Sequence, residues 1–211
     1  MEIELAINLV GLAISGFISR SAYLGYRALG SPNLLRLALA FVLIMGGFAL
    51  ISGSLFVQSD AGRAVFTAGL ALQTAGYFFI AISHGLKSSF DFAPQKSTAL
   101  LLIPLAATPF VIPGNSIEHL VRSISFILLV YVSIETMASY MQTMRSNTLM
   151  IGSGMGTLAV AELMAWYDFV FPGAFYIPSL VAKVAGFGLM FVPFYRLGLA
   201  SGLGRLEKDA Q

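Results

Sequence analysis

Residues 176–194 read Tyr176-Ile-Pro-Ser-Leu-Val-Ala-Lys183-Val-Ala-Gly-Phe-Gly-Leu-Met-Phe-Val-Pro-Phe194, an apolar stretch with one lysine near its middle. A membrane-spanning helix needs about 20 consecutive apolar residues, so this stretch predicts a transmembrane helix. An ammonium group at that depth costs roughly 2.5–3.5 kcal/mol on insertion scales. Lys183 is therefore a candidate functional residue.

The whole chain has the composition of a membrane protein. Of its 211 residues, 57% are apolar and 10% are charged, whereas about 25% are charged in a typical soluble domain. Apolar runs separated by polar residues, glycine or proline predict seven transmembrane helices. The runs cover residues 4–27, 34–57, 63–85, 96–113, 119–142, 147–169 and 175–197. We expect an all-α, polytopic integral membrane protein with a single domain over residues 1–211.

The basic residues lie mainly on one side of the predicted bundle. Seven spans place only Arg63 and Arg122 on the side of the N-terminus and nine basic residues on the other side. The nine are Arg20, Arg27, Arg36, Lys87, Lys96, Arg145, Arg196, Arg205 and Lys208. Because short cytoplasmic loops are enriched in Lys and Arg, we expect the N-terminus outside and the C-terminus in the cytoplasm of a multi-pass plasma-membrane protein. This one-sided charge indicates topology and not a nucleic-acid partner; the expected partners are the lipid bilayer and a second copy or other membrane subunits.

Several kinds of chemistry are disfavoured by the sequence. The chain has no cysteine, which excludes disulfides, thiolate metal sites and cysteine nucleophiles. His84 and His119 are predicted at opposite ends of the bundle, so they do not share a metal ion or a haem. Neither a paired catalytic constellation nor metal-ligand spacing occurs. The sequence therefore predicts a non-enzymatic protein without a metal site.

The two halves of the chain show a faint internal similarity. Residues 32–35, Pro-Asn-Leu-Leu, align with residues 146–149, Ser-Asn-Thr-Leu, at an offset of 114 (146 − 32). Residues 73–77, Gln-Thr-Ala-Gly-Tyr, align with residues 183–187, Lys-Val-Ala-Gly-Phe, at an offset of 110 (183 − 73). A small change in loop length would produce this difference. The pattern predicts a parallel repeat of three helices on each side of a linker helix over 96–113, an arrangement that commonly places a binding site between the halves.

Polar residues inside the predicted spans form two candidate pairs. A helix rises 1.5 Å per residue, so Glu162 and Lys183 both lie roughly 12 Å from the outer ends of neighbouring helices, where they can form an ion pair. Arg20 and Glu135 lie at a similar depth from the cytoplasmic ends and form a second pair if their helices approach. Gln73 lies near mid-depth and could connect the two levels, which together would provide a polar route through the bundle.

Structural roles remain open for the same residues. Arg20 can extend its long side chain to the cytoplasmic interface, and the Glu162–Lys183 pair can serve only to fix helix register. At the outer end of the 147–169 helix, Trp166, Tyr167 and Asp168 are interpreted as interfacial anchors.

Residues Ala182 to Leu189, Ala-Lys-Val-Ala-Gly-Phe-Gly-Leu, resemble the last helix of microbial rhodopsins, in which a lysine carries retinal as a Schiff base. The resemblance implies retinal at Lys183 with Glu162 as its counterion. The chain departs from that family at Ser179, where an acid is usual, and at Phe66, where a carboxylate or another marked residue is usual. The layout of three helices, a linker and three helices is also similar to sugar-transporting SWEET proteins.

We therefore expect a membrane protein that senses or translocates a small ligand, ion or proton through the region of Glu162, Lys183, Gln73 and Glu135. Two alternatives stay open: an accessory subunit of a larger membrane complex, and a retinal protein.

Overall fold

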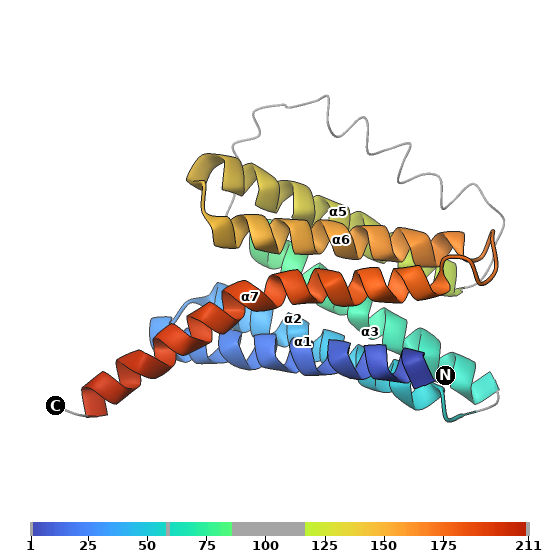
Figure 1. The fold of residues 1–211 in the computed structure, drawn as a ribbon, viewed down its shortest axis with the longest axis horizontal. Coiled ribbons are helices and arrows are strands. Elements are labelled where there is room, and N and C mark those ends of the chain that lie inside the picture. Colours follow the sequence, from blue (N-terminus) through green and yellow to red (C-terminus); the bar gives the residue numbers. More distant parts are fainter. Residues whose placement is uncertain (1, 58–59, 86–116, 210–211) are drawn as a thin grey trace.

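A computed structural model describes residues 2–57, 60–85 and 117–209. These residues form six helices and no strand (Figure 1). The helices are α1 (Glu2–Leu29), α2 (Pro32–Ser54), α3 (Asp60–Gly85), α5 (Ile117–Thr143), α6 (Ser146–Tyr167) and α7 (Tyr176–Asp209). All six are long and apolar enough to cross a membrane. The all-α class is confirmed, but the described part of the chain contains six helices, not the predicted seven, because the predicted 96–113 helix lies outside the described residues.

The six helices form a closed ring in which each helix packs against two others. The order around the ring is α1, α2, α3, α5, α6 and α7. One end of the ring, called the Glu2 end, contains the starts of α1, α3, α5 and α7. The opposite end, called the Leu29 end, contains the starts of α2 and α6. Consequently α3 and α5 run in the same direction, and so do α7 and α1.

The turn between α1 and α2 has the same backbone structure as the turn between α5 and α6. Gly30 has φ +66° and donates its N–H to Tyr26 O at 2.7 Å, while Met144 has φ +51° and donates its N–H to Tyr140 O, also at 2.7 Å. Both residue pairs are 114 positions apart (144 − 30 and 140 − 26). Among the described residues other than glycine, Met144 alone has a positive φ. A left-handed residue closes each of these helices, as is common at helix ends.

Side-chain hydrogen bonds between helices repeat at the same offset. The Ser19 hydroxyl of α1 donates to Ala38 O of α2, and the Ser133 hydroxyl of α5 donates to Gly152 O of α6, both at 3.0 Å. Each partner is again 114 residues from its counterpart (133 − 19 and 152 − 38). The first two helices of each half are therefore packed in the same register.

Close backbone contacts repeat in the second helix pair of each half. A Cβ built on Gly76 of α3 would lie 2.7 Å from Ala40 O of α2, and one built on Gly186 of α7 would lie 2.9 Å from Gly154 O of α6. Gly76 and Gly186 are 110 residues apart, and Ala40 and Gly154 are 114 apart, the two offsets that the sequence comparison predicts. Small residues let neighbouring helices in membranes approach this closely.

Large apolar side chains fill the centre of the ring from mid-height towards the Leu29 end. Phe48 and Phe187 contact edge to face with ring centroids 5.4 Å apart, and Phe41 and Phe194 contact with centroids 6.2 Å apart. Other buried members of this core are Ile18, Ile44, Tyr77, Ile80, Leu129, Leu158 and Met190. This core fills the ring beyond the Glu2 end.

Gly186→Ala should destabilise the bundle by about 1–3 kcal/mol, because the added methyl meets backbone of α6 that cannot rotate away. Gly188→Ala is the matched control, since nothing lies within 4 Å of a Cβ built there. Thermal unfolding in detergent measures the difference. Equal melting temperatures for the two variants would contradict the close approach of α6 and α7.

Candidate functional site

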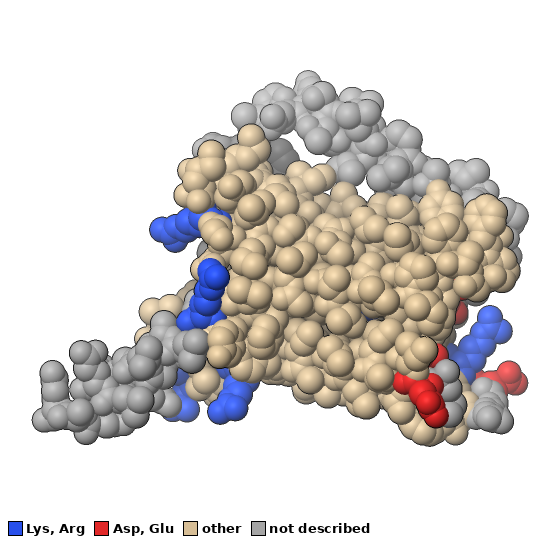
Figure 2. Space-filling view, viewed as in Figure 1, with Lys and Arg blue, Asp and Glu red and all other residues tan. Residues whose placement is uncertain are grey.

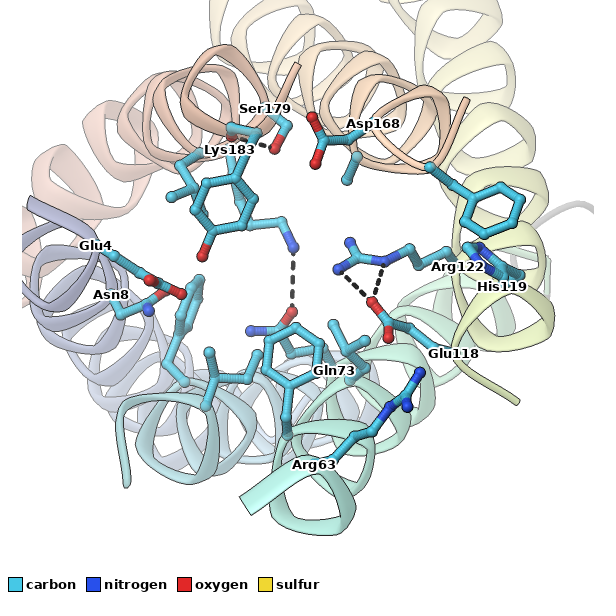
Figure 3. A pocket seen from close by; sticks show the side chains of 18 residues that line it. Glu4, Asn8, Arg63, Gln73, Glu118, His119, Arg122, Asp168, Ser179 and Lys183 are labelled. Atoms are coloured by element: carbon cyan, nitrogen blue, oxygen red, sulfur yellow. Dashed lines mark hydrogen bonds and ion pairs between the residues drawn. The ribbon is translucent and has the colours of Figure 1, made fainter. Parts of the chain in front are cut away.

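A cavity of about 430 Å³ lies inside the ring at the Glu2 end (Figure 3). Its volume lies within the range of small-molecule sites. It is lined by Glu4, Asn8, Phe48, Ile51, Arg63, Phe66, Leu70, Gln73, Glu118, His119, Arg122, Ala165, Asp168, Phe169, Tyr176, Ser179, Leu180 and Lys183. All six described helices contribute to this wall, which combines charged groups near the helix ends with apolar side chains.

The Glu162–Lys183 ion pair expected from their matched depth is present. Lys183 Nζ lies 2.6 Å from Glu162 Oε1, and the two residues are 7% and 2% exposed. Glu162 comes from α6 and Lys183 from α7, which are neighbours in the ring. A buried charge is tolerated only when it is paired and hydrogen-bonded, so each residue supports the ionised form of the other.

Arg122 of α5 extends this pair into a network of four charges. Its Nη1 lies 3.5 Å from Glu162 Oε2, and its Nη2 lies 3.1 Å from Glu118 Oε1 one turn earlier on the same helix. Two carboxylates therefore alternate with two cations, and the formal charge of the network is zero. Arg122 also lies over the ring of Phe66, 5.9 Å from its centroid.

Gln73 of α3 connects the network to the other half of the ring. Lys183 Nζ donates a hydrogen bond to Gln73 Oε1 at 3.3 Å. An ammonium group only donates, so the Gln73 oxygen faces it. The amide nitrogen Nε2 is buried and has no hydrogen-bond partner within the part of the chain that the structure describes. Gln73 and Lys183 are also aligned positions at the offset of 110. Aligned residues of two repeats related by a two-fold axis meet only near that axis.

Other lining residues also occur in aligned pairs. Glu4 and Glu118 are 114 residues apart, while Leu70 and Leu180 are 110 apart, and all four line the cavity. Further aligned lining pairs are Asn8 with Arg122, Ile51 with Ala165, and Phe66 with Tyr176. Both halves thus contribute equivalent positions to the cavity, although the side chains differ at several of them.

The structure does not bring Arg20 and Glu135 together. Arg20 is exposed on α1, Glu135 is half-buried on α5, and among the described residues no ion pair joins them. In the ring, α1 packs against α2 and α7, whereas α5 packs against α3 and α6. These helices are equivalent in the two halves and therefore lie across the ring from each other.

Sequence reasoning missed the role of Arg122, which it counted only as a basic residue of the outer side. The signal was present, because Glu118 and Arg122 have the spacing of four residues that pairs charges on a helix. The interpretation of Trp166 as an interfacial anchor is also not supported, since its side chain is 5% exposed and its Nε1 is buried. Asp168 lines the cavity, and its Oδ1 accepts a hydrogen bond from Phe175 N at 3.0 Å.

No protein-family model, curated protein or solved structure matches this chain. Within the described residues, no group of three or more His, Asp or Glu is placed to hold a metal ion.

Lys183→Met and Glu162→Gln should each destabilise the protein by about 3 kcal/mol, because each leaves a buried charge with fewer partners. The double variant should lose at least about 1 kcal/mol less than the sum of the two single losses. A double-mutant cycle of unfolding free energies in mixed micelles measures this coupling. Arg27→Met, which removes an exposed cation, is the control and should change stability by less than about 0.5 kcal/mol. Additive losses would show that the pair does not stabilise the fold.

Proposed function

We propose that the protein is a non-enzymatic, seven-helix plasma-membrane protein that binds a small solute from the outer side and senses or translocates it. The observation that carries this proposal is the cavity at the Glu2 end, walled by aligned positions from both halves of the ring. Membrane transporters built from repeats commonly have such a site between the repeats. Polar and ionised residues inside a membrane also mark solute routes.

The charge distribution supports an outward-facing cavity. On the face drawn in Figure 2, basic residues gather mainly at the Leu29 end, acidic residues lie at the Glu2 end, and the belt between them shows no charged side chain. Under the positive-inside rule the Leu29 end is cytoplasmic, so the cavity faces the outside. The directions of α3 and α5 support the predicted linker span, because α3 ends at the Leu29 end and α5 begins at the Glu2 end.

The packing of the ring favours a protein that translocates its solute, and it does not favour a rigid accessory subunit. Each half contains a helix pair held together by close backbone contact, with Gly76 in one half and Gly186 in the other. The halves meet at the α7–α1 contact and at the α3–α5 contact. In the α3–α5 contact, Thr74 and Ser125 share a hydrogen bond at 2.6 Å. Two rigid halves that move about these contacts would expose the site to alternate sides. Gly76 and Gly186 pack against helices of the same chain, so they do not indicate contacts with another subunit.

A retinal protein is the second candidate, and the Lys183–Glu162 pair favours it. A lysine with a carboxylate at 2.6 Å has the arrangement that a protonated Schiff base and its counterion would require. Phe48 and Phe187 pack together on the Leu29 side of Lys183. A chromophore would therefore have to occupy the cavity on the Glu2 side, with Phe66 and Tyr176 among the aromatic residues beside it.

Single cysteines test the outward-facing cavity against a background without native thiols. A membrane-impermeant thiol reagent added to intact cells should label Ala165→Cys in the cavity and Ala174→Cys in the loop after α6. It should label Ser146→Cys, at the Leu29 end, only after permeabilisation. Val160→Cys, an exposed position in the apolar belt of α6, is the matched control. It should stay unlabelled, because a thiol that faces lipid does not ionise to the reactive thiolate. Labelling of Ser146→Cys in intact cells would reverse the topology, and an unlabelled Ala165→Cys beside a labelled Ala174→Cys would contradict the open cavity.

The retinal candidate predicts a visible absorption band in protein purified from cells supplied with retinal. Schiff-base formation requires the lysine amine, so Lys183→Ala should abolish the band. Lys87→Ala is the control and should retain it. Purified protein without a visible band would exclude this candidate.

A further inference from the structure

We propose that the solute is a small zwitterion of the amino-acid type with an apolar side chain, an inference that rests on the proposed solute-binding function. Its carboxylate would lie against Gln73 and Lys183 at the floor of the cavity, and its ammonium against Glu4 and Asp168 on the wall. Among the described residues, the cavity contains buried nitrogens without hydrogen-bond partners and carboxylates without ion-pair partners.

The floor of the cavity has hydrogen-bond donors without acceptors. Gln73 is 1% exposed and Asn8 is 2% exposed, yet the side-chain nitrogens Gln73 Nε2 and Asn8 Nδ2 have no hydrogen-bond partner among the described residues. Unsatisfied buried donors cost about 1–3 kcal/mol each. Figure 3 shows the Lys183 ammonium and the Gln73 amide oxygen facing each other near the centre of the ring, with the Gln73 nitrogen to one side of this contact. A ligand carboxylate at this position would accept from both groups.

The wall of the cavity has carboxylates without cations. Glu118 and Glu162 are in ion pairs with Arg122 and Lys183. No ion pair is formed by Glu4 or Asp168 in the part of the chain that the structure describes, although both line the cavity.

Arg63 also lines the cavity without an ion pair among the described residues. Unpaired groups of both signs favour a ligand that carries both charges, because a zwitterion adds no net charge to the low-dielectric site.

The remaining surface of the cavity is apolar and limits the size of the ligand. Phe48, Ile51 and Leu70 line one side, and Leu180 lines the other. These side chains match an aliphatic or aromatic group of the ligand, whose burial would supply most of the affinity. A volume of about 430 Å³ accommodates an amino acid such as leucine and excludes large peptides.

Protection of Ala165→Cys from an impermeant thiol reagent tests the ligand class with three matched probes. Leucine carries both charges, 4-methylpentanoate lacks the ammonium, and 3-methylbutylamine lacks the carboxylate. We expect leucine to slow labelling by tenfold or more at saturation. The other two probes should need concentrations about tenfold higher, because each lacks one charge-assisted contact.

Two substitutions with matched controls assign the charged contacts. Gln73→Glu places a second carboxylate at the floor and should weaken leucine protection by about tenfold or more, whereas Gln142→Glu on the exposed end of α5 should not. Glu4→Gln should weaken protection by leucine but not by 4-methylpentanoate, whereas Glu2→Gln should change neither. Gln73→Glu retains an acceptor for Lys183, and labelling of Ala165→Cys in this variant without leucine checks that the cavity still forms.

The outcomes separate this inference from the function on which it rests. If Ala165→Cys is not labelled at all, the cavity is closed and both proposals fail. If it is labelled but leucine gives no protection, or if the amine or the acid protects as well as leucine does, the cavity is accessible and only the zwitterion assignment is overturned. Unchanged protection in Gln73→Glu would also overturn the assigned orientation.

Discussion

Neutralisation of the buried Glu162 carboxylate is the constraint on which the site depends. Glu162 is 2% exposed in a bundle of apolar helices, where an unpaired ion would cost several kcal/mol. Lys183 from α7 and Arg122 from α5 supply the two cations, so the ion pairs join the three helices α5, α6 and α7. Lys183 then reaches Gln73 in the other half. One carboxylate thereby sets both the packing of one half and the floor of the cavity.

The two offsets, 114 and 110 residues, relate contacts along the whole length of the ring. They connect the turns at Gly30 and Met144, the hydrogen bonds of Ser19 and Ser133, and the close contacts of Gly76 and Gly186. The core is similar in the two halves, whereas the cavity is not. The lining position aligned with Arg122 is Asn8 (122 − 114), so one half contributes a cation where the other contributes an amide. Similar helix packing thus supports a chemically asymmetric site.

The sequence predicted those parts of the structure that depend on composition, spacing and depth. Apolar run length located six helices that the structure describes, and depth matching predicted the Glu162–Lys183 pair. The order of helices around the ring could not be predicted from the sequence, because apolar helix faces of similar composition can pack against one another in many ways. The Arg20–Glu135 hypothesis therefore failed on helix placement and not on depth. Arg122 was missed because the positive-inside count treats a basic residue near a helix end as a loop residue, whereas its side chain lies inside the ring.

We propose a wet, outward-facing binding site beside Lys183, at the contact between two similar halves. The decisive measurement is an experimental structure of the protein in a lipid nanodisc, at a resolution that shows side chains and ordered water. We expect density for water or a small solute among Gln73, Lys183 and Asn8, with the Glu162–Lys183 pair beneath it. A dry, closed contact in which side chains fill the space between α3 and α7 would contradict it.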